Sequence, residues 1–252
     1  MAAIKHLLEA PHGGNAADAA EFNLVPPSLG ERGLRAVFSA FSASVFQLWC
    51  PLTVIGRERL PKPPFLLCSN HCSHMDSAVL MTGSGLPFNH CAMLAAKDYF
   101  FENKKRQGFL PRLMNLIPTE RRASRHAIAE VLRISQQFIR DGDRCLIMYP
   151  EGTRSVTGEL QSIKKGAAMI AFELGIPIVP VHIDGTFRAW PKGVIFARPT
   201  RLTMRVGAPI IPADFLDKTQ AEGQNDRQTY AKMTDELALR LRQLATEQTN
   251  VR

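Results

Sequence analysis

The chain has 252 residues, of which 45% are hydrophobic and 21% charged, a composition typical of a globular protein. These values exclude intrinsic disorder, collagen and coiled coil, and the length fits one large α/β domain with a short appendage. The formal net charge of +8 favours an anionic partner such as nucleic acid, acidic lipid or a phosphorylated small molecule. The five cysteines are odd in number and lie in apolar segments, so we expect reduced thiols and a cytosolic face.

Residues 1–33 are expected to form a poorly defined leader. They lack the basic start and the following apolar run that are typical of a secretory signal. The next segment, residues 34–56, carries no charge from Ala36 to Gly56 and repeats apolar residues at helical spacing. Pro51 should end this helix after about 15 residues, or about 22 Å, whereas a bilayer core about 30 Å thick takes about 20 residues to cross. The segment therefore predicts an amphipathic helix that lies on a membrane, with Trp49 near the headgroups. A helix packed on the core of the domain is the alternative.

Beyond residue 57, short apolar runs alternate with helical patterns. The strand-like runs are Phe65–Ser69, Cys91–Ala96, Cys145–Tyr149, Ile176–Ile183 and Leu202–Val206. The helical patterns are Arg125–Arg140, which has Ser124 as N-cap, Lys165–Leu174, which Gly175 closes, and Asp226–Gln248. This alternation predicts an α/β layered domain over residues 57–252, with a largely parallel central sheet flanked by helices.

The first chemically informative motif follows the strand expected at residues 65–69. It reads Asn70-His71-Cys72-Ser73-His74-Met75-Asp76 and occupies the position where open α/β sheets place their sites. Across a strand-to-helix turn, Asp76 can reach one imidazole nitrogen of His71 and fix its tautomer. The other nitrogen is then free to take a proton from a hydroxyl. A packed, hydrogen-bonded histidine without a chemical role is the alternative.

A second motif, Tyr149-Pro150-Glu151-Gly152-Thr153-Arg154-Ser155, again follows an apolar strand. Glycine lets the backbone approach a ligand closely and arginine offers a planar pair of donors, so this loop suits a phosphate or another anion. Basic residues also gather between Lys97 and Arg125, with eight Lys or Arg against three acids, and between Arg188 and Arg205, with five against none. With the uncharged apolar segment upstream, these stretches favour a surface that faces phosphates or anionic lipid.

Together the two motifs resemble the signature pair of the glycerolipid acyltransferase family, and especially its lysophosphatidic acid acyltransferase branch. Two weaker blocks agree in order and place, Ile117-Pro118-Thr119-Glu120-Arg121 and Ile178-Val179-Pro180-Val181-His182-Ile183-Asp184-Gly185-Thr186. The similarity spans residues 57–210. The sequence departs from the family's pattern in having Arg122 directly after Arg121, and in Cys72 and His74 within the first motif.

The resemblance implies transfer of a fatty acyl group from acyl-CoA or acyl carrier protein to the free hydroxyl of a lysophospholipid. The simplest case converts 1-acyl-glycerol-3-phosphate to phosphatidic acid, and another lyso-lipid acceptor is the alternative. It implies His71 as general base and Asp76 as its orienter, without a metal or a cofactor other than the co-substrate. The implied substrate-binding residues are Lys97, Arg121, Arg122, Glu151, Gly152, Thr153 and Arg154. The expected location is the cytoplasmic face of an anionic membrane, the inner membrane in a bacterium, with no nucleic-acid partner.

Three other interpretations stay open on the sequence alone. His71, His74 and Asp76 could form the metal site of a hydrolase, although the spacing differs from that of zinc hydrolases with a related pattern. Cys72 could be the nucleophile of a thioesterase or cysteine acyltransferase, although the base would then be expected on a neighbouring element. The chain could also be a non-catalytic protein that binds lipid or nucleic acid, although it shows no recognisable nucleic-acid-binding motif.

Overall fold

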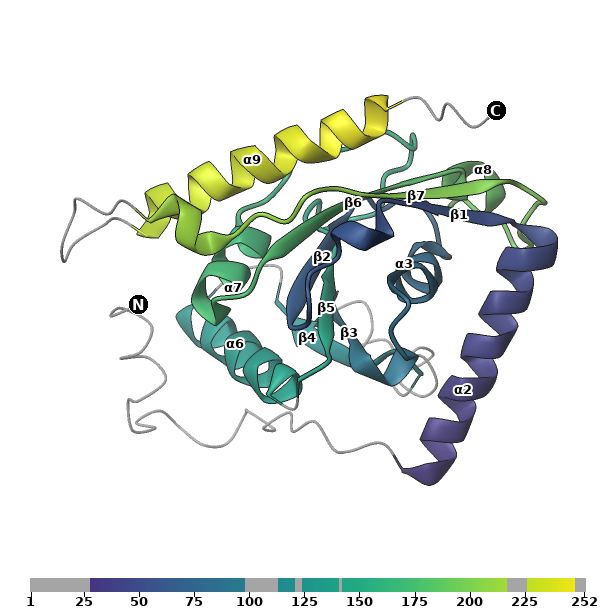
Figure 1. Ribbon diagram of the computed structural model, residues 1–252, viewed down its shortest axis with the longest axis horizontal. Coiled ribbons are helices and arrows are strands. Elements are labelled where there is room, and N and C mark those ends of the chain that lie inside the picture. The colour runs from purple at the N-terminus through teal and green to yellow at the C-terminus, as the bar shows by residue number, and fades with distance from the viewer. Residues whose placement is uncertain (1–27, 98–112, 121–123, 141, 217–225, 248–252) are drawn as a thin grey trace.

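A seven-stranded sheet forms the centre of the computed structural model, which describes residues 28–97, 113–120, 124–140, 142–216 and 226–247 (Figure 1). The strands follow the spatial order β1-β7-β6-β2-β5-β3-β4. Their bounds are β1 Leu52–Ile55, β2 Phe65–Ser69, β3 Cys91–Ala96, β4 Leu116–Thr119, β5 Cys145–Met148, β6 Ile178–Asp184 and β7 Leu202–Val206. All neighbouring pairs are parallel except β6 and β7, which are antiparallel. The predicted α/β fold with a largely parallel sheet is confirmed.

Helices cover both faces of this sheet. The α-helices are α2 Leu29–Ser44, α3 Asp76–Ser84, α6 Arg125–Ile139, α7 Gly166–Leu174, α8 Thr186–Ala189 and α9 Asp226–Thr246. The described residues also form four short helices of other types, η1 Val45–Trp49, η2 Arg57–Arg59, η3 Phe88–His90 and η4 Pro212–Phe215. Figure 1 shows α6, α7 and α9 on one side of the sheet and α2 and α3 on the other.

Each face of the sheet has its own hydrophobic core, which β2 illustrates. Phe65 and Leu67 belong to the cluster that includes residues of α3 and η1, whereas Leu66 and Cys68 belong to the cluster formed with α6, α7 and α9. Successive side chains of a strand point to opposite faces, and all of β2 is buried, as expected for a central parallel strand. Residues at the end of β2 are therefore positioned from both sides.

Two of the predicted helix boundaries have the expected local causes. The hydroxyl of Ser124 accepts a hydrogen bond from the Ala127 N–H at 3.1 Å and caps α6. Gly175 ends α7 with a φ of 65°, in the left-handed region that favours glycine.

The N-terminal helix begins earlier than predicted and ends before Pro51, as predicted. It starts at Leu29, five residues before the expected Leu34, because Ser28 and Glu31 form a reciprocal capping box. The helix continues through η1, which Pro51 follows. Leu52–Ile55 is not part of this segment's helix, but the edge strand β1, which pairs in parallel with β7. Pairing with a strand far along the chain decides this conformation.

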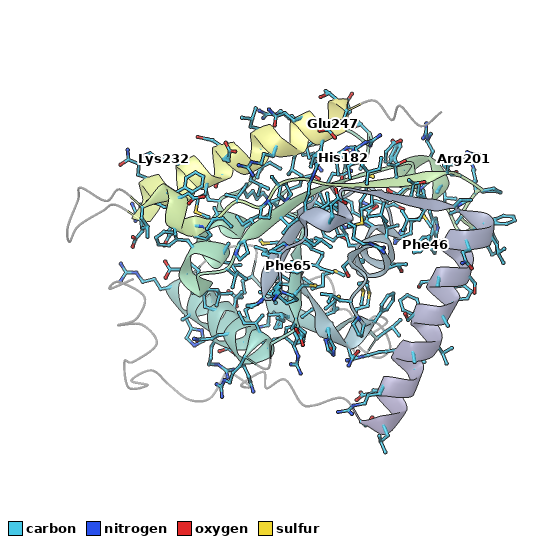
Figure 2. The ribbon with its side chains drawn as sticks, viewed as in Figure 1. Phe46, Phe65, His182, Arg201, Lys232 and Glu247 are labelled. Atoms are coloured by element: carbon cyan, nitrogen blue, oxygen red, sulfur yellow. The ribbon has the colours of Figure 1, made fainter. Side chains whose placement is uncertain are left out.

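The apolar residues of α2 and η1 divide between two faces. Phe38 packs against Phe88 with ring centroids 5.7 Å apart, and Phe46 is buried in the core (Figure 2). Val37, Phe41 and Leu48 instead are 67%, 62% and 83% exposed. The helix therefore packs on the domain, as one alternative expected, and still presents an apolar outer face. Within the described ranges, no helix combines the length and apolarity that crossing a bilayer demands.

Candidate active site

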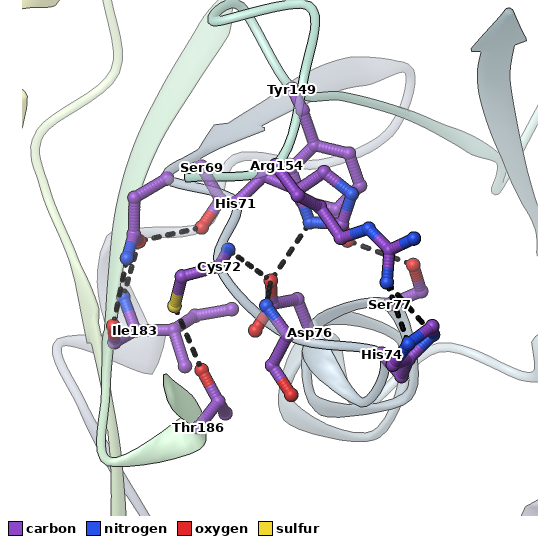
Figure 3. Close-up of polar contacts among 12 residues, drawn as sticks. Ser69, His71, Cys72, His74, Asp76, Ser77, Tyr149, Arg154, Ile183 and Thr186 are labelled. Carbon is purple, nitrogen blue, oxygen red and sulfur yellow. Dashed lines mark hydrogen bonds and ion pairs between the residues drawn. The ribbon is translucent and has the colours of Figure 1, made fainter. Parts of the chain in front are cut away.

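The two signature motifs lie side by side because the strands that precede them are neighbours. β2 and β5 pair in parallel, with Phe65 opposite Cys145 and Cys68 opposite Met148. The loops that leave both strands therefore emerge at the same edge of the sheet, where open α/β folds form their sites. Figure 3 shows the resulting cluster around His71.

Asn70 fixes the turn out of β2. Its side-chain NH₂ donates to the Ile183 carbonyl at 2.9 Å, and its side-chain oxygen accepts from the Ile183 N–H at 2.8 Å. The amide thus takes the place of a strand peptide and joins the end of β2 to β6. Asn70 is buried, so this contact fixes the point at which the loop of the first motif begins.

His71 and Asp76 form the contact that their spacing predicts. His71 Nδ1 lies 2.8 Å from Asp76 Oδ2 (Figure 3). The same carboxylate oxygen accepts the backbone N–H groups of Cys72 and Ser73, each at 2.8 Å. Asp76 is fully buried and is the first residue of α3, where the helix dipole stabilises a negative charge. The carboxylate is therefore held independently of the imidazole, and the His71 side chain retains 20% exposure.

Tyr149 stacks on the imidazole, a contact that sequence reasoning missed. The two ring centroids are 3.8 Å apart and the rings are within 10° of parallel. The tyrosine hydroxyl lies 2.8 Å from Ser77 Oγ on α3. Burial raises the pKa of Tyr149 well above its usual value, so the phenol is neutral. The available signal was the aromatic first residue of the second motif, which the sequence interpretation also counted as the last residue of an apolar strand.

The second motif holds the backbone of His71 from both sides. The His71 N–H donates to Glu151 Oε1 at 2.7 Å, and the His71 carbonyl accepts from the Ser155 N–H at 2.7 Å. The other oxygen of Glu151 accepts the Gln161 N–H at 2.9 Å. Burial raises the pKa of the Glu151 carboxyl, and the backbone hydrogen bonds from His71 and Gln161 offset only part of this rise. Glu151 therefore contacts the loop of the first motif, and the substrate-binding role that the resemblance implies for it stays a prediction.

Arg154, one of the expected anion-binding residues, contacts the first motif. Its Nη1 lies 2.9 Å from His74 Nδ1 and 2.8 Å from His74 Nε2. Gly152 and Thr153 form the exposed tip of the same loop. Gly152 has a φ of 75°, in the left-handed region that favours glycine, so another residue at this position would strain the backbone.

The remaining expected binding residues are more distant or lie elsewhere. Lys97 follows β3, which β5 separates from β2, and its Nζ lies 3.9 Å from Glu120 Oε1. It is exposed at the same edge of the sheet as His71. Arg121 and Arg122 lie outside the described residues.

The structure also bears on the other interpretations of the first motif. Cys72 is buried, its Sγ lies 3.4 Å from Thr186 Oγ1, and burial raises the pKa of its thiol to about 12. A thiol that stays protonated near neutral pH does not suit a nucleophile. His74 turns to Arg154 and not toward Asp76. Across the parts of the chain that the structure describes, no three His, Cys, Asp or Glu side chains gather in a way that could hold a metal ion.

The chain also matches a known protein family. A family model described as acyltransferase matches residues 51–184, which is more than half of the chain and contains both motifs. The chain belongs to the acyltransferase family. The matched region runs from β1 through β6, so the family similarity covers the sheet edge that carries the His71–Asp76 contact.

Individual members of the acyltransferase family resemble the chain over part of their length. The 1-acyl-sn-glycerol-3-phosphate acyltransferase of Cocos nucifera is 30% identical over 165 residues, which cover 66% of this chain and 51% of that protein. The enzyme of the same name from Saccharomyces cerevisiae is 34% identical over 162 residues, which cover 62% of this chain and 50% of that protein. The chain thus spans about half the length of these relatives.

A solved structure shares the fold of this acyltransferase-family chain. The 1-acyl-sn-glycerophosphate (LPA) acyltransferase of Thermotoga maritima matches with a TM-score of 0.61 and 24% identity. The match covers 87% of this chain and 83% of that chain.

Proposed function

We propose that the protein is an O-acyltransferase that moves a fatty acyl group from an acyl thioester to the free hydroxyl of a lysophospholipid. The simplest acceptor is 1-acyl-glycerol-3-phosphate, which gives phosphatidic acid. The observation that carries the proposal is the buried Asp76 carboxylate on Nδ1 of a partly exposed His71, beside a loop that bears Arg154. The names of the family members described above support the same acceptor.

In the proposed reaction His71 acts as general base through Nε2. This nitrogen takes the proton of the acceptor hydroxyl as the hydroxyl oxygen attacks the thioester carbonyl. Asp76 fixes the tautomer and stabilises the imidazolium that forms. The tetrahedral intermediate then expels the thiolate, which takes the proton from His71, so that an ester and a free thiol leave the site. The stack with Tyr149 keeps the ring in the plane that this transfer needs.

The basic side chains at this edge are proposed to hold the acceptor phosphate. Arg154 offers a planar pair of donors, and Lys97 adds positive charge at the same edge of the sheet. Arg121 and Arg122, which the family resemblance implies as binding residues, are proposed to contact the phosphate as well. Gly152 and Thr153 would line the approach at the tip of the loop. A gripped phosphate places the hydroxyl near His71, and such positioning contributes on the order of 7–11 kcal/mol at best.

An assay with labelled acyl donor tests the reaction. Purified protein is given acyl-CoA or acyl carrier protein and a panel of lyso-lipids, with and without a chelator. We expect His71→Ala to lower kcat about 100-fold or more, and His126→Ala, an exposed histidine on α6, to leave it unchanged. A kcat close to normal in His71→Ala would contradict the general-base role, and loss of turnover with the chelator would favour the metal-dependent alternative.

The acceptor is tested separately through Arg154. Arg154→Lys keeps the charge and loses the planar pair of donors, so kcat/KM for a phosphorylated acceptor should fall about tenfold to a hundredfold through KM. Arg140→Lys, exposed at the end of α6, serves as control. The kcat/KM for a neutral lyso-lipid should be the same in both variants as in the unmodified protein. Equal losses with phosphorylated and neutral acceptors would remove the proposed acceptor and leave the acyl transfer in place.

We also propose that the outer face of α2 and η1 lies on a membrane. This anchor face consists of Val37, Phe41, Leu48 and Trp49, which are each at least half exposed. Its first three members are spaced by four and seven residues and therefore share one side of the helix. Large apolar side chains exposed together mark a site of interaction, and a lipid surface is where the proposed acceptor and product reside. The expected location is the cytoplasmic face.

A further inference from the structure

A second exposed apolar site lies on the loop that follows α8. Ile195 and Phe196 are 78% and 81% exposed, comparable with Leu48 at 83% on the anchor face. The proposed chemistry at His71 uses neither residue. Two adjacent large apolar side chains in water are costly to keep on a surface unless a partner covers them.

The loop that carries this pair has a defined internal structure. Its neck is closed by the Arg198 N–H, which donates to the Ala189 carbonyl at 2.8 Å. Within the loop, the indole N–H of Trp190 donates to the Val194 carbonyl at 2.8 Å. Residues 190–201, which we term the tip loop, therefore hold Ile195 and Phe196 outward on a fixed support.

The tip loop is continuous with the anchor face. The indole N–H of Trp49 donates to the Ala197 carbonyl at 3.0 Å. The next residue, Cys50, directs its thiol to the Arg198 carbonyl at 3.4 Å. In Figure 1, α8 and the end of α2 accordingly lie on the same side of the molecule. Leu48 and Trp49 thus adjoin the loop that bears Ile195 and Phe196.

The charge around the tip loop is basic. Lys192, Arg198 and Arg201 are exposed, and the sequence contains no Asp or Glu from residue 185 to residue 213. An apolar tip with basic flanks is complementary to a bilayer whose headgroups are anionic, since the apolar side chains enter the acyl region while the basic groups meet phosphates.

The base of the tip loop reaches the candidate active site. The hydroxyl of Ser73, in the first motif, donates to the Trp190 carbonyl at 2.7 Å. The Trp190 ring lies 5.5 Å from the ring of His74, which contacts Arg154. The exposed tip and the catalytic loop are therefore connected through one residue.

We propose that the tip loop inserts Ile195 and Phe196 into an anionic phospholipid bilayer, beside the anchor face, and so holds the active site at the lipid surface. This inference rests on the proposed acyl transfer at a membrane. The bilayer contact is then made by two segments far apart in sequence that Trp49 joins.

A fluorescent probe at the tip tests insertion directly. All five native cysteines are buried, so Phe196→Cys provides a thiol that can be labelled selectively. Leu239→Cys, on α9 and 48% exposed, is the matched control. With vesicles of phosphatidylcholine and phosphatidylglycerol, an environment-sensitive dye at position 196 should shift to the blue and be quenched by spin-labelled lipid, whereas the dye at 239 should not respond. A probe at 196 that stays in water while the protein is vesicle-bound would overturn the proposal, as would failure of the protein to bind vesicles.

A second comparison separates this proposal from the proposed reaction. The double change Ile195→Ser and Phe196→Ser should lower vesicle affinity about tenfold or more, because two large apolar side chains no longer leave water. Leu239→Ser should not change it. Acyl transfer to a water-soluble, short-chain acceptor should be the same in all three proteins. Unchanged vesicle affinity in the double variant would overturn the tip-loop proposal alone, whereas absence of acyl transfer in all three would overturn the reaction and leave the insertion result valid.

Discussion

Both buried carboxylates of the candidate site accept hydrogen bonds from backbone N–H groups. Asp76 receives those of Cys72 and Ser73, and Glu151 receives those of His71 and Gln161. Charge-assisted bonds of this kind are about twice as strong as neutral ones. Each carboxylate therefore fixes the backbone of the loop that carries the imidazole, in addition to placing a negative charge near the imidazole.

Because Asp76 holds the backbone as well as the imidazole, Asp76→Asn and His71→Ala should differ in their effect on stability, although both should lower kcat. Asp76→Asn should lower kcat and also lower the free energy of unfolding by about 1.5–3 kcal/mol, since the buried charge that the backbone N–H groups contact is lost. His71→Ala should lower kcat with little change in stability. Urea denaturation of both variants measures the difference, and equal stabilities would show that the Asp76 contacts contribute little to folding.

Glu151 should behave as a positioning residue. In Glu151→Gln one carboxylate oxygen becomes an NH₂ group that faces a backbone N–H, so the His71 backbone loses part of its support. We expect a lower kcat, about tenfold or more, with the KM of the acceptor nearly unchanged. Glu159→Gln, exposed in the same loop, is the control. A raised KM at normal kcat would instead favour the substrate-binding role.

The stack of Tyr149 on His71 predicts a graded pair of effects. Tyr149→Phe keeps the ring and loses only the hydrogen bond to Ser77, so kcat should change by a small factor. Tyr149→Leu removes the stack, which contributes about 0.5–1.5 kcal/mol, and kcat should fall about two- to tenfold. If the two variants lose activity equally, the hydroxyl and not the ring is the important part.

At the scale of elements, local signals were sufficient for the ends of α6 and α7 and insufficient for the edge strand β1. Ser124 and Gly175 act within a few residues of themselves, so the bounds of α6 and α7 could be predicted. β1 lies in an apolar run that continues a helix, and only its pairing with β7 makes it a strand. β4 contains Pro118, which is tolerated because β4 is an edge strand of the sheet.

The candidate site divides in the same way. The His71–Asp76 contact depends on a spacing of five residues and could be predicted from the sequence. The stack with Tyr149 and the hydrogen bond to Glu151 join residues about eighty positions apart, through the pairing of β2 with β5. Nothing in the two motifs themselves indicates which backbone atoms Glu151 contacts.

The β6–β7 pair should make stability depend on pH. His182 lies opposite Arg205, and burial together with that cation lowers the pKa of His182 to about 4 from 6.5. Between these values the unfolded chain binds a proton that the folded chain does not. Stability should therefore be lost as the pH falls from about 6.5 to about 4, by up to about 3 kcal/mol.

Denaturation with urea across this pH range checks the assignment. His182→Gln should flatten the dependence, whereas His126→Gln, at an exposed position on α6, should leave it as in the unmodified protein. Asp184, at the end of β6, raises the pKa of His182. This effect is smaller than the lowering by burial and Arg205, so the pKa of His182 stays below its usual value. Identical curves for the unmodified protein and His182→Gln would assign the pH dependence to other groups.

At the scale of the whole molecule, one face of α2 packs on the domain and the other face is exposed. Phe38→Ser should destabilise the fold by about 1.5–3 kcal/mol, because Phe38 packs against Phe88. Phe41→Ser, at 62% exposure, should leave stability unchanged and weaken vesicle binding. High salt should weaken binding without abolishing it, since screening acts on the basic groups and not on apolar contacts. Complete release of the unmodified protein by salt would contradict the anchor face.

The amide of Asn70 is also protected against spontaneous deamidation. That reaction begins when the backbone nitrogen of the following residue attacks the side-chain carbonyl carbon. Here the following nitrogen, that of His71, is held by Glu151, and both polar atoms of the Asn70 side chain are held by Ile183. Loss of ammonia would place a carboxylate oxygen against the Ile183 carbonyl and push the ends of β2 and β6 apart. The contacts that fix the turn after β2 thus also slow the deamidation of Asn70.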